Sequence, residues 1–325
     1  MRKKFNTCLI FVILLVSGYL LFYHANDVME SVLFAFSIWQ NNLFPSLFPF
    51  FVLANILIQY GFVSFLGDIL NNFMMNFFNL KGECGFVLAM SMISGFPSGA
   101  KYTKNLYQDK IIDEKDANHL ITFTHFSNPF FIIGTIGSLF LKNIKLGYLI
   151  LIVHILTNFI IGIIFKNKTN KYKTLKKISI KKALGKMHRT RLKNNKTFSQ
   201  IITSSINDAL KTLLLMLGVI SFFLIITTLI KEQLPLNDLD KTIISGILEM
   251  TQGIKFASIL DISIKWKSVL MTMFISFGGF SVHMQVISIL EDTKVRYKTF
   301  FIARILHAII SGSIIWFLLT IKSFI

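Results

Sequence analysis

Cysteine, proline and acidic residues are all scarce in this chain of 325 residues. Its two cysteines, Cys8 and Cys84, lie in or beside apolar segments and match neither a disulfide framework nor a metal-ligand spacing. Charged residues make up only 15% of the chain, against about 25% in a soluble domain. The sequence also lacks a Walker loop, a Gly-x-Ser-x-Gly elbow and a His-Glu-x-x-His motif. We therefore expect no enzyme, no metal centre and no other cofactor.

Hydrophobic residues, in contrast, make up 53% of the chain, and its mean hydropathy is +0.62. Five windows contain no acidic residue, lysine or arginine and have roughly the length of about 20 residues that a bilayer requires. They are residues 44–67, 146–165, 212–230, 268–290 and 305–321. We therefore predict an all-α, polytopic transmembrane helical bundle in the cell membrane.

The net charge of +18 is concentrated in one segment. Thirteen of the 34 basic residues fall in residues 166–196, which contain no acidic residue, so the rest of the chain carries 21 basic against 16 acidic residues. A basic loop between apolar spans is typical of the cytoplasmic face, where it can also touch anionic lipid. Because no nucleic-acid-binding fold or aromatic platform accompanies the charge, we do not expect a nucleic-acid partner.

These features divide the chain into four parts. Residues 1–26 form an N-terminal transmembrane helix, which we expect to remain uncleaved because no small-residue cleavage site follows its long apolar core. Residues 27–165 form a first membrane half, residues 166–197 the basic cytoplasmic loop, and residues 198–325 a second membrane half. Within the first half, Asp27 to Leu43 reads as an interfacial amphipathic stretch, and the two prolines that follow open a span from Leu47 to Phe65.

Several apolar segments are interrupted by residues that break helices. Gly95, Pro97 and Gly99 interrupt residues 85–100, and further breaks fall at 127–129, 249–253 and 276–281. Interrupted backbone at membrane depth persists only where it is buried in protein or lines a watery cavity, and in transporters it marks the substrate site. The candidate substrate-binding residues are therefore Ser94, Gly95, Ser98, Gly99, Lys101, Ser127, Asn128, Glu249, Thr251, Gln252, Gly278, Gly279, Ser281, His283 and Gln285.

The ionisable members of this set have alternative explanations. Lys101 is the best cation for an anionic substrate, but it also fits a lysine that reaches for the membrane interface. Glu249 fits either a site or coupling group, or a buried ion-pair partner. His125 and His283 occupy corresponding broken segments and fit hydrogen-bonded packing residues equally well. Arg304 and His307 are three residues apart in the last span and could face the bundle together. We expect them to tether this span to its neighbours rather than to take part in transport.

The order of segments in the two halves is similar, although few residues are identical. If residue 1 and the basic loop are both cytoplasmic, the halves enter the membrane from opposite faces. Two such halves form an inverted repeat, a recurrent plan of transporters. The alternative is a generic bundle, because spans and amphipathic segments alternate in many membrane proteins.

Five motifs in order resemble the YlbJ/SpoVV sporulation integral membrane proteins, which carry the nucleoside-recognition "gate" domain. The motifs cover residues from about 30 to 320 and are residues 44–51, 94–101, 127–129, 248–253 and 277–285. The gate domain in turn resembles parts of concentrative nucleoside transporters, in which two hairpins and two broken helices hold the substrate. This family usually has a polar pair before Ser-Pro, whereas this chain reads His125 to Pro129, so the role of His125 stays open.

The resemblance implies an endospore-forming bacterium and a role in spore maturation, in which dipicolinate moves across the outer forespore membrane. The first hypothesis is accordingly a transporter of a small anionic solute, most simply dipicolinate. One alternative is a nucleoside or nucleobase permease, and another is a non-transporting membrane scaffold. The expected partners are this small-molecule substrate and the lipid membrane, while a homo-oligomer and a coupling ion stay open.

Overall fold

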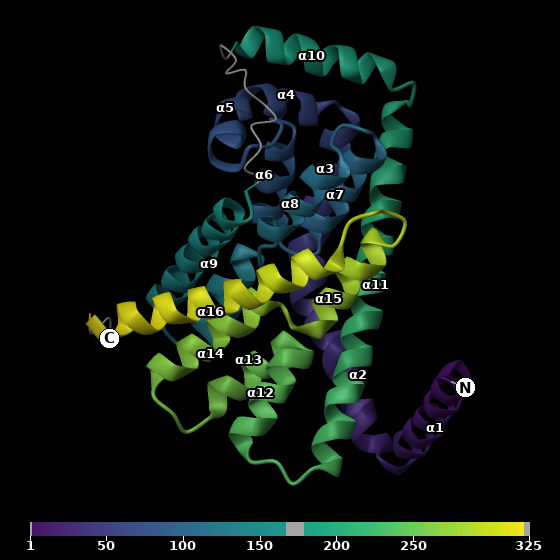
Figure 1. The fold of residues 1–325 in the computed structure, drawn as a ribbon, viewed down its shortest axis with the longest axis vertical. Coiled ribbons are helices and arrows are strands. Elements are labelled where there is room, and N and C mark those ends of the chain that lie inside the picture. The colour runs from purple at the N-terminus through teal and green to yellow at the C-terminus, as the bar shows by residue number, and fades with distance from the viewer. Residues whose placement is uncertain (1, 167–178, 322–325) are drawn as a thin grey trace.

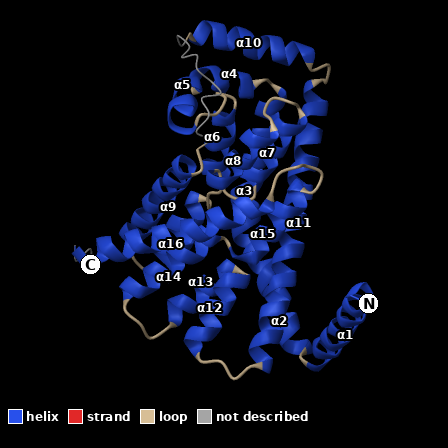
Figure 2. Cartoon of the chain, viewed as in Figure 1, coloured by secondary structure: helices blue, strands red, loops and turns tan. Residues whose placement is uncertain are grey.

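The computed structural model describes residues 2–166 and 179–321, which form helices and connecting loops without a strand among them (Figures 1 and 2). Within these described residues, five helical stretches are long and apolar enough to cross a membrane: Ala25–Gln59, Ile144–Ile164, Phe198–Gln233, Ile264–Leu290 and Tyr297–Ile321. The predicted all-α, polytopic membrane architecture is thus confirmed.

The N-terminal helix α1 (Arg2–Tyr23) projects from one side of the bundle (Figure 1). It is followed by α2 (Ala25–Ile38), the π-helical η1 (Trp39–Leu43) and α3 (Phe44–Gln59), which run as one stretch of 35 residues. The predicted span from Leu47 to Phe65 is therefore wrong, because the helix passes through residues 43–47 without a break and ends at Gln59, while the interfacial position predicted for 27–43 stays a prediction. Pro45 lies in the first turn of α3, where a missing N–H is tolerated, and the π-turn before it lets the helix continue.

Helix α11 (Phe198–Gln233) runs alongside this stretch for most of its length. The Ser31 hydroxyl lies 2.6 Å from the Thr228 hydroxyl, and the Trp39 indole donates to the Leu213 carbonyl at 2.8 Å. With 36 residues, α11 is about 54 Å long, longer than the hydrocarbon core. The amphipathic stretch predicted over 198–211 and the span over 212–230 are thus one continuous helix.

The rest of the first half consists of a helical hairpin, a broken helix and a full span. After the short elements α4 (Phe62–Ile69), α5 (Asn71–Phe73) and η2 (Met74–Phe78), the hairpin is formed by α6 (Cys84–Ser94) and α7 (Ser98–Gln108). The broken helix comprises α8 (Glu114–Phe123) and the π-helical η3 (Phe131–Phe140), and the span is α9 (Ile144–Ile164).

The second half follows α11 with the same three units in the same order. Its hairpin is α12 (Asp238–Leu248) with α13 (Met250–Ile259), its broken helix is α14 (Ile264–Phe277) with α15 (Gly279–Leu290), and its closing span is α16 (Tyr297–Ile321). Each half thus carries a hairpin tip and a helix break. The first tip is residues 95–97 and the first break is residues 124–130. The second tip is Glu249 and the second break is Gly278.

The segment predicted as a basic loop contains a helix, α10 (Ile180–Lys193), which lies across one end of the bundle (Figure 1). The remainder of that loop, 167–178, lies outside the described residues. Lys186 of α10 pairs with Asp68 at 3.3 Å and with Glu83 at 3.2 Å. Partial burial opposes the charge on Lys186, but the Glu83 and Asp68 carboxylates outweigh it and raise the pKa of Lys186. The pairs therefore hold α10 against the first half.

Two apolar clusters meet near the middle of the bundle. One joins the first-half break to α9 and α13–α16, and includes Phe96, Phe131 and Met250. The other lies between the α2–α3 stretch and α11, and includes Leu47 and Met216. The tips and breaks of both halves lie at the boundary between these clusters.

Candidate functional site

Both hairpin tips, the first helix break and the start of α15 converge on one small cavity. Its walls come from the start of α3, the first tip, the first break, the middle of α11, the second tip and α15. The lining residues are Leu43, Leu47, Phe96, Ser127, Asn128, Phe131, Met216, Ile220, Glu249, Met250, Thr251, Val282 and Gln285. Met216 and Ile220 belong to the central turns of α11, so the cavity lies beside the middle of this long apolar helix.

The first hairpin tip and the first helix break approach so closely that residue 95 has to be glycine. Gly95 ends α6 with φ +75°, and a Cβ built there would lie 2.6 Å from the Asn128 backbone nitrogen. Asn128 in turn caps the following helix, because its side-chain oxygen accepts a hydrogen bond from Phe130 N–H at 2.8 Å. The first tip and the first break therefore form one rigid wall of the cavity.

The second tip is built around Glu249, which is 1% exposed. Its carboxylate accepts hydrogen bonds from the Thr251 hydroxyl and from Gln252 N–H, the latter at 3.0 Å, and so caps the N-terminus of α13. Gly279, with φ +69°, lets the second break approach this tip, since a Cβ there would lie 3.0 Å from Met250 N. The carboxylate is thus a structural cap that also faces the cavity.

The electrostatics of the lining are unusual for a membrane interior. Among the described residues that line the cavity, Glu249 is the one with an ionisable side chain. Helices α13 and α15 begin at the second tip and the second break, beside the cavity, and the Glu249 carboxylate already caps α13. Such helix N-termini suit a negatively charged group without a lysine or arginine in the wall.

Three buried amide atoms in or beside the cavity have no hydrogen-bond partner: Nδ2 of Asn128, Oε1 of Gln252 and Oε1 of Gln285. An unpaired buried polar atom costs about 1–3 kcal/mol, and such atoms are rare in native proteins. These three atoms, one donor and two acceptors, would be able to form hydrogen bonds with a polar ligand in the cavity. The cavity measures only about 20 Å³, so the site is closed.

Five of the predicted residues line this cavity together: Ser127, Asn128, Glu249, Thr251 and Gln285. Gln252 and Ser281 are buried beside them, and Gly95, Gly278 and Gly279 shape the backbone of the tips and breaks. In contrast, the Ser94 and Ser98 hydroxyls donate to the Met90 and Gly95 carbonyls of their own hairpin. Gly99 packs against the Thr124 carbonyl. These three residues hold the first hairpin rather than line the cavity.

Lys101 and His283 also lie outside the lining. The Lys101 ammonium donates to the Asp208 carbonyl at 3.1 Å and to the Thr212 hydroxyl at 2.9 Å, and so ties α7 to α11. His283 lies 3.0 Å from the Phe277 carbonyl and 2.9 Å from the Tyr297 hydroxyl. Both side chains join neighbouring elements in this closed conformation.

A second polar network lies behind the first break, around the fully buried Arg304. Its guanidinium donates to the carbonyls of Thr122 and His125 at the end of α8 and to the Asn158 side chain at 3.2 Å. A cation at a helix C-terminus is favourable, and here it supplies donors to carbonyls that the break leaves without a helical partner. His307 Nδ1, 2.8 Å from Arg304, completes the tether expected for this pair.

His154 extends this network to the other half. Its Nε2 accepts the Ser127 N–H at 3.0 Å, so the proton lies on Nδ1, which faces the Ser276 hydroxyl at 3.1 Å. The network thus joins the first break directly to α14.

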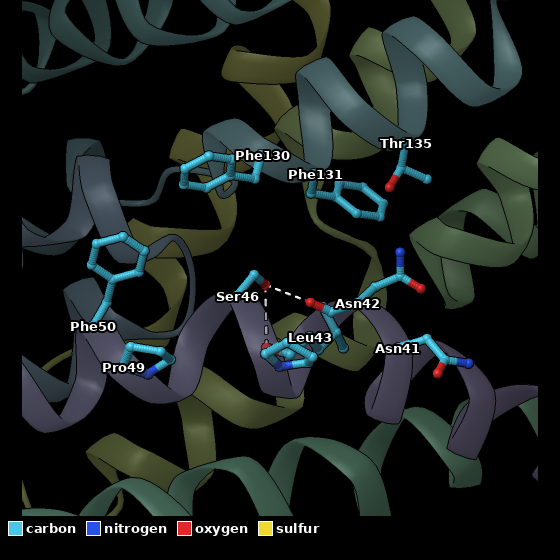
Figure 3. A pocket seen from close by; sticks show the side chains of 10 residues that line it. Asn41, Asn42, Leu43, Ser46, Pro49, Phe50, Phe130, Phe131 and Thr135 are labelled. Carbon is cyan, nitrogen blue, oxygen red and sulfur yellow. Dashed lines mark hydrogen bonds between the residues drawn. The ribbon is translucent and has the colours of Figure 1, made fainter.

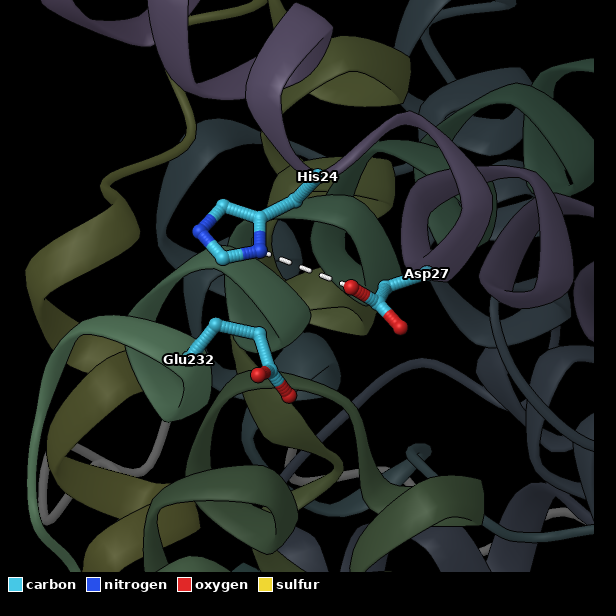
Figure 4. A group of neighbouring side chains, drawn as sticks. All are labelled: His24, Asp27 and Glu232. Atoms are coloured by element: carbon cyan, nitrogen blue, oxygen red, sulfur yellow. Dashed lines mark ion pairs between the residues drawn. The ribbon is translucent and has the colours of Figure 1, made fainter.

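One further cluster lies at the end of α11 remote from α10. His24, Asp27 and Glu232 point toward one another there, with ligand atoms within 4.8 Å of each other (Figure 4). The residue types suit a divalent cation, but His24 is already 3.5 Å from Asp27 and 2.8 Å from the Gln233 amide. These contacts join the start of α2 to the end of α11.

Sequence reasoning missed two groups of residues. The apolar wall, notably Phe96 and Phe131, carried no signal because phenylalanine is abundant throughout the chain. His154 and Asn158 lie within a mainly apolar span. They are four residues apart and therefore share one helical face, and this spacing could have indicated a buried polar contact.

A family model described as "Gate: Nucleoside recognition" matches residues 42–143, which hold the first tip and the first break. No solved structure matches the chain. The sporulation integral membrane protein YlbJ of Bacillus subtilis (strain 168) is 35% identical over 332 aligned positions, covering 94% of this chain and 81% of that protein. The chain therefore belongs to the YlbJ family of sporulation integral membrane proteins and is itself a multi-pass integral membrane protein.

Proposed function

We propose that this protein is a non-enzymatic transporter of a small planar solute with carboxylate groups, and that the solute is dipicolinate. The observation that carries the proposal is the convergence of two hairpin tips, the first helix break and the start of α15 on one small cavity with unpaired polar atoms. Phe96 and Phe131 offer faces for a ring, and the helix N-termini with Asn128 Nδ2 offer donors to carboxylates.

The proposed direction is out of the mother-cell cytoplasm and across the outer forespore membrane. A dianion that leaves an inside-negative compartment gains roughly 2.3 kcal/mol per charge per 100 mV, so the membrane potential alone is able to drive this movement. The proposed repeat fits such a carrier, because the two halves present the same units to one site.

A nucleoside or nucleobase permease is the second candidate, and one observation favours it. The cavity wall holds a carboxylate and no basic residue, with Lys101 engaged by α11. The unpaired acceptors of Gln252 and Gln285 would suit the N–H groups of a base.

Uptake by purified protein in proteoliposomes tests the proposal. With an inside-positive potential, radiolabelled dipicolinate should accumulate at least tenfold over protein-free liposomes, whereas uridine should not. Uptake of uridine alone would favour the permease. If neither solute enters vesicles whose protein is folded by size-exclusion chromatography, the scaffold role becomes the better account.

A further inference from the structure

A second, open cleft lies directly beside the closed cavity. It has a volume of about 500 Å³ and separates η1 and α3 from the start of η3 (Figure 3). Asn42, Ser46 and Pro49 lie on one side, and Phe130, Phe131 and Thr135 lie on the other. Leu43 and Phe131 line both the cleft and the cavity, so these two side chains are the partition between them.

The cleft lining is mainly apolar, but it also holds two amides and the hydroxyls of Ser46 and Thr135, where a lipid-facing surface would be apolar throughout. Neighbouring outward residues, such as Phe36, Leu53 and Leu139, are apolar and exposed, as expected of a lipid-facing surface. Asn41 and Asn42 are also exposed, although Trp39 beside them bonds to the middle of α11. Amides at that depth are costly in lipid and are found facing water-filled cavities. The cleft therefore has the lining of an aqueous vestibule.

The partition lies where the helices are least regular. Leu43 ends η1, in which Phe44 N–H bonds to the Trp39 carbonyl five residues earlier. Phe131 begins η3, which is π-helical over ten residues. Pro45 and Pro49 supply no N–H, so the ladder of α3 is weakened on the cleft side, and the Ser46 hydroxyl makes an additional bond to the Asn42 carbonyl at 2.6 Å. Such π-turns are frequent at functional sites.

The small volume of the cavity means that the partition has to move before a solute can bind. A small-molecule site commonly measures about 300–1,000 Å³, far more than the about 20 Å³ of the closed cavity. Displacing Leu43 and Phe131 would merge the cavity with the cleft without parting either tip from the break of its own half, a contact made at Gly95 in the first half and at Gly279 in the second.

We propose that the cleft between α3 and η3 is the aqueous vestibule through which the solute reaches the closed site, and that Leu43 and Phe131 form the gate between the two. This inference rests on the proposed function for the identity of the solute. The water-filled cleft and the gate are properties of the protein alone.

Thiol labelling tests both statements without any solute. In a Cys8→Ser/Cys84→Ala background, Asn42→Cys should react with the membrane-impermeant reagent 2-sulfonatoethyl methanethiosulfonate at least tenfold faster than Ile152→Cys. Ile152 is a matched control because it is exposed on α9 without a polar cleft. Equal rates at the two positions would overturn the vestibule.

The gate is tested with a reporter in the closed site. Labelling of Gln285→Cys should be slow, should rise at least tenfold when combined with Phe131→Ala, and should rise by a smaller factor with Phe131→Leu. Phe130→Ala is the control, because Phe130 lines the cleft but not the cavity. If Phe130→Ala and Phe131→Ala have equal effects, or if Phe131→Leu and Phe131→Ala both leave the rate unchanged, the gate is refuted. Failed uptake with these labelling results intact would overturn the proposed solute only.

Discussion

The Gln285 side chain is buried in the cavity wall with an unpaired carbonyl oxygen. We expect Gln285→Leu, which has a similar size, to raise the unfolding free energy by about 1–3 kcal/mol because it removes that atom. The same change should weaken solute binding at least tenfold. Thermal unfolding and uptake kinetics measure the two effects. Gln108→Leu is the control, because Gln108 is exposed at the end of α7, and it should change neither. A Gln285→Leu protein that is less stable yet transports normally would remove Gln285 from the site.

Arg304 illustrates the opposite case, a buried cation whose donors are used. Arg304→Met leaves the Thr122 and His125 carbonyls and the Asn158 oxygen without this donor, at roughly 1–3 kcal/mol for each acceptor. We expect the protein to unfold at much lower temperature or to disappear from the membrane. Arg296→Met, at a side chain 76% exposed, should be neutral by the same measurements. Equal abundance and stability of the two variants would contradict the tethering role.

At the scale of elements, the contact between a hairpin tip and a helix break is the recurrent feature. Gly95→Ala would place a Cβ 2.6 Å from Asn128 N and would force an unfavourable backbone at φ +75°, which alone costs about 1–3 kcal/mol. We expect loss of uptake together with a lower unfolding temperature. Gly134→Ala, which meets no atom within 4 Å, should have no effect on either. If Gly95→Ala behaved like Gly134→Ala, the tip would not need its close approach.

The breaks themselves could be predicted from the sequence, because Gly95, Pro97 and Asn128 interrupt runs that are otherwise apolar. Five cavity residues followed from that reasoning, since broken backbone must line or be buried beside a site. The long helix over 25–59 could not be predicted. Pro45 is read locally as a helix start, whereas a π-turn and the surface of α11 carry the helix through it.

The direction in which individual side chains point could not be predicted from the sequence either. Lys101 follows the first tip closely enough to suggest a site cation, but its position on α7 turns it toward Asp208 and Thr212 of α11. Such a direction depends on how helices distant in sequence pack, and no local pattern contains that information. The same applies to Phe131, which differs from its neighbour Phe130 only in the surface that it faces.

At the scale of the whole molecule, orientation is the first property to test. The basic segment predicts that α10 is cytoplasmic and that the connection between α11 and α12 lies on the opposite face. An impermeant thiol reagent added outside intact cells should label Leu239→Cys and leave Leu184→Cys unlabelled until the cells are permeabilised. Both leucines are exposed, so accessibility does not favour either. The reverse labelling would contradict the inverted arrangement of the two halves.

The central claim is that the cavity between the two tips and the two breaks binds the transported solute, and Glu249 is its one ionisable wall residue. Glu249→Gln keeps an oxygen that can cap α13 but removes the charge, so the fold should survive. The matched control is Glu232→Gln, at the remote end of α11.

The most direct measurement is therefore the initial rate of dipicolinate uptake into proteoliposomes that contain equal amounts of folded wild-type, Glu249→Gln or Glu232→Gln protein. The account predicts that Glu249→Gln changes this rate at least tenfold, because it removes the one charge in the wall that would face the dianion, and that Glu232→Gln leaves the rate at the wild-type value. A wild-type rate for well-folded Glu249→Gln would contradict it and place the solute elsewhere in the protein.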